Sequence, residues 1–250
     1  MALQGKTVLI TRPASQSGDL RSGLEALGAR VVECPSIEIV PIVDWTDVDR
    51  AIADLNSYQW LIFTSTNAVE HFMQRIAAKG VACAVPIAVI GASTAAKLED
   101  WNLKAARVPA RYRAEGLLEM FTEELSGVRI LLPRAEAARE LLPDELRRRG
   151  ATVDVVTVYR TVKSEAGLAD LRLTLTSQTI DVVAFTSPSA IRSISETLGD
   201  DLATLLSPIP IAVLGPIASE AVESVGLKAV IQPAKATVQD LVDAIQRYFT

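Results

Sequence analysis

The sequence has few of the residues that bind metals or form disulfides. It contains one histidine and two cysteines, and the cysteines, Cys34 and Cys83, lie far apart with no CxxC spacing. A structural zinc site takes about four closely placed histidine or cysteine ligands, so we predict no metal ion. Isolated thiols are typical of a reducing cytosol, and both cysteines are interpreted as core residues.

Long apolar runs and an excess of basic charge are also missing. The longest apolar stretch, between Val81 and Ile90, is interrupted by Pro86, so no segment is predicted to cross a bilayer. The first residues lack a basic region followed by an apolar core, which indicates a cytoplasmic protein without a secretory signal. A formal net charge of -5 argues against a broad nucleic-acid or membrane surface.

The familiar signatures of catalysis are absent as well. The chain has no Walker A loop, no GxGxxG fingerprint and no GxSxG elbow. Its lone histidine, His71, falls on a predicted helix, where a packing or surface role is favoured over catalysis. A content of 49% hydrophobic and 22% charged residues is typical of a globular protein, and 250 residues suffice for two ordinary cores.

What the sequence does contain is an internal repeat. Blocks from the first half recur in the second half, in the same order and at a nearly constant offset. The matching pairs are Gly5–Arg12 with Gly127–Arg134, Gly28–Ala29 with Gly150–Ala151, Trp60–Ser65 with Val182–Ser187, Ile87–Gly91 with Ile211–Gly215, Leu103–Ala105 with Leu227–Ala229, and Ala114–Leu118 with Thr237–Leu241. The chain is therefore two copies of one unit.

Each copy alternates apolar strand patterns with helical patterns. Continuous apolar runs such as Val8–Ile10 and Leu61–Phe63 predict parallel strands that are buried on both faces. Gly28 and Gly150 stand where helix C-caps belong, and Ser187 with Pro188 has the pattern of a helix start. The predicted fold class is α/β, with two similar doubly wound parallel-sheet domains joined by a two-stranded β-ladder linker.

Two stretches in which apolar and polar residues alternate predict how the chain passes between these domains. We interpret residues 35–43 and 156–164 as paired extended linkers. Domain 1 is then discontinuous, with residues 1–34 and 165–250, and domain 2 covers residues 44–155. The working site is expected in the cleft between the two domains.

Hydroxyls and small residues follow the predicted strands, where helices begin. Such turns are Thr64–Asn67, Gly91–Thr94, Thr186–Ser189 and Gly215–Ser219. Free N–H groups at a helix N-terminus favour anions, so the turns are candidate anion-binding sites. The alternative is that the hydroxyls only cap their helices, and the two roles can coexist.

Positions where the two copies differ are candidates for specialised chemistry. Ile37 aligns with Tyr159, and Thr94 aligns with Ala218. A phenol can donate a proton where an isoleucine cannot, although a tyrosine that packs its ring and leaves its hydroxyl in water is the alternative.

Two arginines stand at matching places in the copies. Arg12 and Arg134 each follow the first strand of a copy. Either side chain can pair with a ligand carboxylate, although a solvated loop arginine is equally consistent with the pattern.

Several of these segments together resemble the uroporphyrinogen-III synthase family. They run in order along essentially the whole chain and are Ile10–Pro13, Phe63–Val69, Ile90–Ala95, Ala114–Leu118, Val158–Thr161 and Phe185–Ala190. The resemblance implies two α/β domains joined by a two-stranded ladder. It also implies an enzyme of haem and tetrapyrrole biosynthesis, a cyclising hydro-lyase that needs no metal or organic cofactor.

The substrate implied by the resemblance is hydroxymethylbilane, a linear tetrapyrrole with eight carboxylates. The family removes water from it and closes the ring with inversion of the last pyrrole, ring D, to give uroporphyrinogen III; without enzyme the bilane closes without inversion. Matching of motifs places Tyr159 and Thr94 at positions that the family associates with activity, so both are predicted to be catalytic. The predicted substrate-binding residues are Arg12, Thr64, Ser65, Asn67, Ser93, Arg134, Ser187, Ser189 and Ser219.

In one turn the sequence departs from the family pattern. The family commonly has threonine where this chain has Ala218, with Ser219 next to it. In the mechanism that we expect, Tyr159 assists departure of the hydroxymethyl oxygen, and the resulting azafulvene is attacked at the substituted carbon of the last ring through a spiro intermediate. Amides after Ser65, Thr94 and Ser187 would hold carboxylates.

Two other functions are compatible with this fold. One is a non-catalytic tetrapyrrole or anion sensor, and the other is a solute-binding protein like the periplasmic receptors. Retention of Tyr159 favours the enzyme over the sensor, and the absence of a signal peptide counts against the receptor. The expected partner is the small-molecule substrate, with no nucleic acid and no membrane; a monomer with transient contact to hydroxymethylbilane synthase is predicted.

Overall fold

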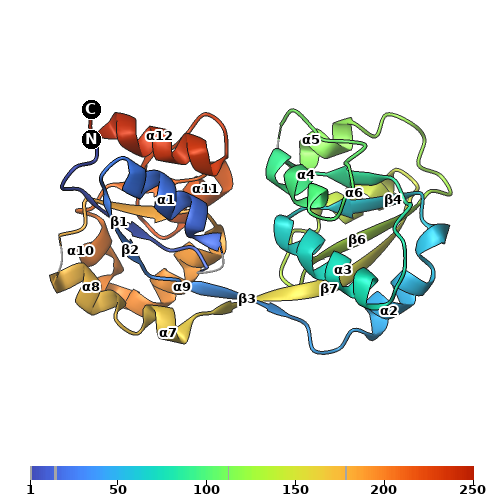
Figure 1. Cartoon of the computed structure of the whole chain (residues 1–250), viewed down its shortest axis with the longest axis horizontal. Coiled ribbons are helices and arrows are strands. Elements are labelled where there is room, and N and C mark those ends of the chain that lie inside the picture. The colour runs from blue at the N-terminus through green and yellow to red at the C-terminus, as the bar shows by residue number, and fades with distance from the viewer. Residues whose placement is uncertain (1, 14–15, 112, 178) are drawn as a thin grey trace. The chain divides into compact units, whose positions relative to one another are not determined.

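A computed structural model describes residues 2–13, 16–111, 113–177 and 179–250. The chain divides into two compact units (Figure 1). Unit 1 consists of Met1–Glu38 and Val162–Thr250, and unit 2 of Ile39–Thr161. Each unit therefore takes its first strand–helix–strand segment from one copy of the repeat and most of its remaining elements from the other.

Unit 1 is built on a five-stranded parallel sheet. The strand order is β10-β9-β8-β1-β2, and every strand runs parallel to its neighbours. Its strands are β1 (Thr7–Ile10), β2 (Arg30–Glu33), β8 (Val182–Phe185), β9 (Ile211–Val213) and β10 (Ala229–Ile231).

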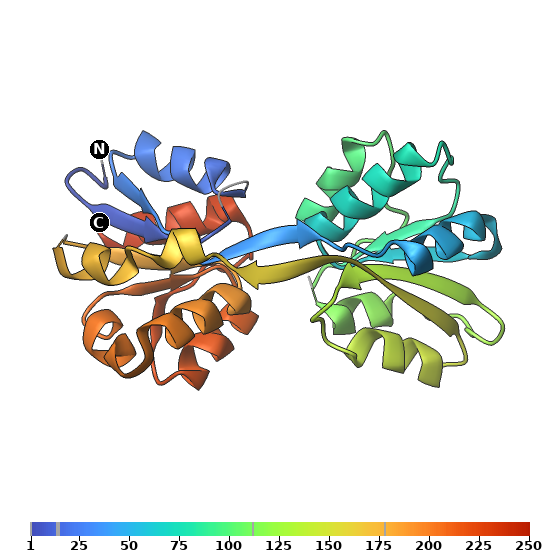
Figure 2. The same cartoon turned by 90° about the horizontal axis from the view of Figure 1, so that it is seen from below.

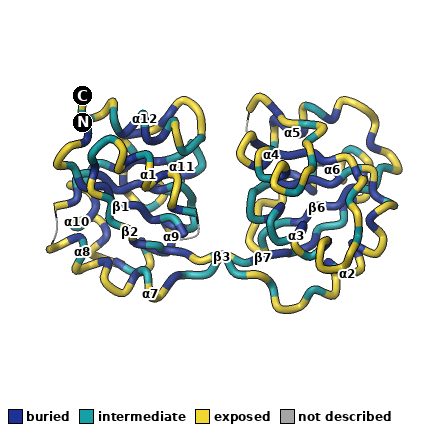
Figure 3. Tube along the Cα trace, viewed as in Figure 1, coloured by how far each residue is buried: buried dark blue, intermediate teal, exposed yellow. Residues whose placement is uncertain are grey.

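Helices cover both faces of this sheet, so its central strands are fully buried (Figure 3). Alternate residues of β1 and β8 serve different cores: Leu9 and Val183 pack with α8 to α11, whereas Val8 and Val182 pack with α1 and α12. The helices are α1 (Gly18–Ala26), α7 (Glu165–Leu168), α8 (Leu171–Ser177), α9 (Pro188–Leu198), α10 (Leu202–Leu206), α11 (Pro216–Ser224) and α12 (Val238–Tyr248), with a 3-10 turn at Gly199–Asp201.

Four strands of unit 2 have the same order as their equivalents in unit 1, and the fifth strand of each sheet lies at the opposite edge. The sheet of unit 2 has the order β3-β7-β6-β4-β5, and the pairs among β7, β6, β4 and β5 are parallel. The strands are β3 (Ile37–Pro41), β4 (Trp60–Phe63), β5 (Ile87–Val89), β6 (Arg129–Ala135) and β7 (Thr152–Lys163). The predicted fold class, two parallel-sheet α/β domains from one duplication, is confirmed.

Two separate cores flank the sheet of unit 2. One packs α2, α3 and α4 against the strands, and the other packs α5 and α6. The helices are α2 (Thr46–Ala53), α3 (Thr66–Ala78), α4 (Ala92–Glu99), α5 (Ala114–Glu119) and α6 (Leu141–Arg148), with a 3-10 turn at Leu55–Ser57.

The chain passes between the units along β3 and β7, which are neighbours in the sheet and run in opposite directions (Figure 2). All but the last residue of the predicted linker 156–164 belongs to a longer strand, because β7 begins at Thr152, ends at Lys163 and pairs with β6. Tyr159, within this predicted linker, is the last β7 residue paired with β6, opposite Ala135, next to an irregularity in the register.

The helix ends follow the local signals in the sequence. Gly28 and Gly150 have φ angles of 90° and 96°, the left-handed conformation that a glycine adopts readily after a helix. Ser187 Oγ accepts a hydrogen bond from Ala190 N–H, and Pro188 occupies the first helical position. Among the described residues, no helix is long and apolar enough to cross a membrane.

Candidate active site

The candidate site of unit 2 lies where the neighbouring strands β4 and β5 end and the helices α3 and α4 begin. Ser65 follows β4 with an extended backbone and caps α3, because its Oγ accepts a hydrogen bond from Ala68 N–H at 3.1 Å. Gly91 follows β5 and occupies the equivalent position before α4. Since β4 and β5 pair in parallel, both helix N-termini lie at one edge of the sheet.

Tyr159 reaches this edge from β7. Its side chain belongs to the core, with 7% of the residue exposed, and its hydroxyl lies 3.1 Å from Ser65 Oγ. The imidazole of His71 stacks on the phenol, with ring centroids 5.7 Å apart and planes at 26°. The ring of Tyr159 is therefore packed in the core, as the alternative to a catalytic role expected. Its hydroxyl is not left in water, however, because it bonds to Ser65, which is itself a predicted site residue.

The turn before α4 supplies a second predicted catalytic residue. Thr94 sits in the first turn of α4 with 4% of its surface exposed, and its hydroxyl makes no hydrogen bond to another described residue. Ser93 beside it is exposed, and Thr64 and Asn67 at the start of α3 are half-buried.

Arg134 is already paired within unit 2. Its guanidinium forms an ion pair with Glu140, and Nη1 also donates to the carbonyl oxygen of Arg139 at 3.3 Å. The arginine side chain is only 11% exposed. A ligand carboxylate would therefore have to replace Glu140 to use this charge.

Unit 1 has the matching turns. Ser187 caps α9, with a distance of 3.3 Å between its Oγ and the nitrogen of Ala190, and Gly215 precedes α11. Ser189 is half-buried, and Ser219 Oγ donates to a carboxylate oxygen of Glu223 at 3.4 Å. In this unit too, the helix N-termini follow the adjacent strands β8 and β9, so the predicted residues share one edge of the sheet.

Arg12 lies directly after β1 in unit 1. Its Nη2 donates to Gln16 Oε1 at 3.5 Å, but Nε is buried and has no hydrogen-bond partner among the described residues. Burial lowers the pKa of this guanidinium, and the charge of Asp19 opposes that shift. An arginine stays protonated in proteins even when burial lowers its pKa, so Arg12 offers a cationic hydrogen-bond donor to an anion.

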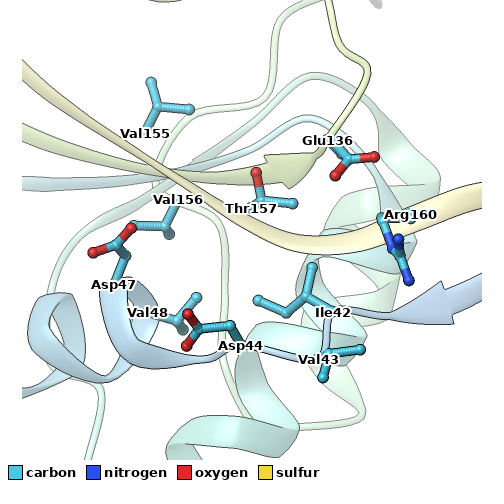
Figure 4. A pocket seen from close by; sticks show the side chains of 10 residues that line it. All are labelled: Ile42, Val43, Asp44, Asp47, Val48, Glu136, Val155, Val156, Thr157 and Arg160. Atoms are coloured by element: carbon cyan, nitrogen blue, oxygen red, sulfur yellow. The ribbon is translucent and has the colours of Figure 1, made fainter.

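A pocket of about 390 Å3 in unit 2 involves residues that the sequence did not select (Figure 4). Asp44 and Asp47 line one part of it, and Glu136 and Arg160 line another. None of the predicted site residues lines this pocket, and its three carboxylates suit a polycarboxylate ligand poorly.

Two residues that lie close to Tyr159, namely His71 and Arg160, were not selected from the sequence. His71 was assigned to packing or surface, and it does pack, but on the ring of the predicted catalytic tyrosine. Arg160 follows Tyr159 and has a buried Nε with no partner among the described residues. The sequence did contain one signal for His71: the two copies differ at this position, where the second copy has Ser193.

The described residues contain no group of three or more histidine, cysteine, aspartate or glutamate side chains that could hold a metal ion. Cys34 is buried, and burial raises the pKa of its thiol to about 11. A thiol in this state is a poor nucleophile and a poor metal ligand.

Comparison with known proteins gives one consistent result. The family described as uroporphyrinogen-III synthase HemD matches residues 18–243. The uroporphyrinogen-III synthase of Synechococcus elongatus is 34% identical over 98% of this chain and 96% of its own length. That of Chlorobaculum parvum is 27% identical over 91% of this chain and 93% of its own length.

Solved structures show the same fold. A mutant uroporphyrinogen III synthase from Thermus thermophilus superposes with a TM-score of 0.69 at 18% identity, covering 97% of this chain and 98% of its own. The enzyme from Helicobacter pylori gives a TM-score of 0.60 at 14% identity, covering 97% and 99% of the two chains. Together with the family match over most of the sequence, these findings show that the chain belongs to the uroporphyrinogen-III synthase family.

Proposed function

We propose that this chain cyclises hydroxymethylbilane to uroporphyrinogen III, with loss of water and inversion of ring D, and that Tyr159 is its proton donor. Family membership supports the reaction, and one contact supports the residue: the hydroxyl of Tyr159 meets Ser65 Oγ at the edge of the sheet where two helices begin. A phenol held at a helix N-terminus lies next to N–H groups that attract the substrate's carboxylates.

The chemistry divides between positioning and proton transfer. The bilane is intrinsically reactive, so holding its two ends in one arrangement supplies most of the acceleration, on the order of 7–11 kcal/mol. Tyr159 donates its proton to the hydroxymethyl oxygen as the carbon–oxygen bond breaks and water leaves. The azafulvene is then attacked by the substituted carbon of the last ring, which gives a spiro intermediate. The bond from that carbon to its original methylene bridge breaks, and the freed methylene carbon bonds to the unsubstituted α-carbon of the same ring. The proton that this α-carbon loses as the pyrrole ring regains aromaticity restores the phenol. One such donor contributes about 10²–10⁴-fold.

The carboxylates are proposed to bind at the helix N-termini. In unit 2 these are the first turns of α3 and α4, which carry Ser65 and Thr94, and in unit 1 that of α9, which carries Ser187. Arg12 adds a cationic group with a buried, unpartnered Nε. The remaining proposed contacts are Thr64, Asn67, Ser93, Arg134, Ser189 and Ser219.

Three further features are part of the proposal. The chain acts as a monomer, works in the cytoplasm, and takes its substrate during transient contact with hydroxymethylbilane synthase. The chemical reason for the last feature is that free bilane closes spontaneously without inversion, so a short transfer favours the correct isomer.

A coupled assay tests the function. Hydroxymethylbilane is generated in situ by its synthase, the protein is added, and the oxidised uroporphyrin isomers are separated by chromatography. Mainly type III product is expected. Type I product alone, from a protein whose circular dichroism shows it folded, would exclude the enzyme; tight tetrapyrrole binding in that experiment would then identify the sensor.

A further inference from the structure

Helix α3 holds the phenol of Tyr159 at two points. Its N-cap residue, Ser65, contacts the hydroxyl at 3.1 Å, and His71 in its second turn stacks on the ring. The centroid distance of 5.7 Å and the angle of 26° are those of offset stacked rings. Because both contacts come from one helix, ring and hydroxyl are fixed with respect to the same rigid element.

We infer that His71 is a positioning residue for Tyr159, whose imidazole fixes the plane of the phenol ring and so the direction in which the phenol proton can be donated. The inference rests on the proposed role of Tyr159 as proton donor. A phenolic O–H lies near the plane of its ring because the oxygen is conjugated with it. The torsion that turns the ring is broad and two-fold, so contacts on the ring face decide the plane.

The hydrogen bonds of Ser65 complement this arrangement. A serine hydroxyl has one proton and two acceptor sites, and Ala68 N–H already uses one acceptor site of Ser65. When Ser65 donates its single proton to the phenol oxygen, the proton of Tyr159 is left for the substrate. Ser65 then fixes the position of the oxygen, while His71 fixes the plane in which its proton lies.

The imidazole is suited to stacking because it is mainly uncharged at neutral pH. Its half-buried site lowers the pKa of His71, with the charge of Glu70 opposing the shift. Lys97 pairs with Glu70 at 2.6 Å and so reduces that opposition. A neutral ring packs against an aromatic face without the hydration that an imidazolium requires.

Unit 1 supports the pairing of these residues. Where unit 2 has Tyr159 and His71, the aligned positions, both in unit 1, carry Ile37 and Ser193. Ser65 aligns with Ser187, and both serines cap their helices. The capping serine is thus common to both copies, whereas the tyrosine and the histidine occur together in one unit and are both replaced at the aligned positions.

Steady-state kinetics of type III formation test the inference. His71→Ala is expected to lower kcat about tenfold with KM within about twofold, since only the orientation of the donor is lost. His71→Phe restores a flat ring and should return kcat to within about twofold of the wild type. Ser193→Ala, at the aligned position of unit 1, is the control and should leave both constants unchanged.

A double-mutant cycle separates positioning from a general structural effect. In a Tyr159→Phe background, His71→Ala should cause no further loss of kcat, because there is no phenol proton left to direct. An equal loss in both backgrounds, or a raised KM with unchanged kcat, would overturn the inference.

One readout does not depend on activity. NMR of ring-labelled tyrosine, with the Tyr159 signals assigned from Tyr159→Phe, measures how fast this ring flips. Flipping should be at least about tenfold faster in His71→Ala than in the wild type and near the wild-type rate in His71→Phe. Unchanged flipping contradicts the positioning role, whereas fast flipping together with a fully active Tyr159→Phe contradicts only the proposed proton donor.

Discussion

The turn after β4 and the turn after β8 each carry a serine that caps the next helix, but they differ in the side chain that contacts this serine. Ser65 and Ser187 each cap a helix, with Oγ–N distances of 3.1 Å and 3.3 Å. Ser65 meets the phenol of Tyr159, which reaches it from β7, and Ser187 meets no phenol among the described residues. The position that aligns with Tyr159 carries Ile37, which is 4% exposed and has no polar side-chain atom.

The strands that carry these residues also differ. β7 is unbroken over 12 residues, whereas the aligned part of the first copy is split into β2 and β3. Pro35 lies between them and aligns with Thr157. Proline has no N–H to continue a ladder, and Ser36 instead donates from both N and Oγ to the carbonyl oxygen of Thr11. The two copies therefore share the capping serines, whereas the tyrosine stands on the strand of one copy and is Ile37 in the other.

The largest expected effect concerns the cores of the two units. Phe63 and Phe185 align in the repeat and are 0% and 1% exposed. Truncation of either to alanine leaves a cavity and should lower the free energy of unfolding of its own unit by about 3–5 kcal/mol. Circular dichroism follows both units during urea unfolding. Fluorescence follows unit 2 alone, because all three tryptophans, Trp45, Trp60 and Trp101, lie there.

The two probes make this prediction decisive. Phe185→Ala should shift the circular dichroism transition and leave the fluorescence midpoint in place, while Phe63→Ala should shift the fluorescence midpoint. Equal shifts of both signals in both variants would mean that the units unfold as one cooperative system, and that their cores are not energetically separate.

The next largest effect concerns two buried phenols of unit 2. Tyr159→Phe should lower kcat for type III product at least about 100-fold, which corresponds to about 2.7 kcal/mol, because the proton donor is lost. Tyr58→Phe is the matched control, since its hydroxyl donates to Asp154 Oδ2 at 2.8 Å away from the site. It should cost about 1 kcal/mol of stability and change kcat less than about twofold. A Tyr159→Phe enzyme with full activity at low and saturating substrate would refute the donor role.

Local signals account for the parts of the structure that the sequence predicted. Apolar runs such as Val8–Ile10 predict buried parallel strands because both sheet faces are covered. Gly28 predicts the end of a helix and the Ser187–Pro188 pair predicts the start of one, because each signal depends only on residues close by in the sequence. The repeat then extends these predictions from one unit to the other.

The contacts of the candidate site depend on information that is not local. Ser65 and Tyr159 lie 94 positions apart, and they meet only because β7 pairs with β6 in one register and turns that side chain toward α3. The stacking of His71 depends in addition on the rotation of α3 about its axis. Likewise, Arg12 and Arg134 share a sequence pattern, but Glu140 pairs with only one of them.

A smaller effect is expected where Thr94 of unit 2 aligns with Ala218 of unit 1. Both residues are 4% exposed in the first turn of a helix. Thr94→Ala removes a hydroxyl that bonds to no described residue and also a buried methyl group, so the free energy of unfolding should fall by about 1 kcal/mol. If the hydroxyl serves the reaction, kcat falls about tenfold, or about 1.4 kcal/mol, and Thr94→Ser restores it. Ala218→Ser should leave kcat unchanged; loss of stability without loss of rate in Thr94→Ala would assign Thr94 to packing.

The smallest expected effect is a dependence of stability on pH that is confined to unit 2, because the chain's one histidine, His71, lies there. Its pKa is lowered by burial from the ordinary value of 6.5, so the folded protein binds this proton less readily than the unfolded chain. The resulting stability is fully present above pH 6.5 and is lost as the pH falls through the folded pKa. Because the ring is half-buried, the loss should be less than about 1 kcal/mol. Urea unfolding followed by tryptophan fluorescence between about pH 5 and 7 should show it in the wild type and not in His71→Phe. The same slope in both proteins would assign it to groups other than His71.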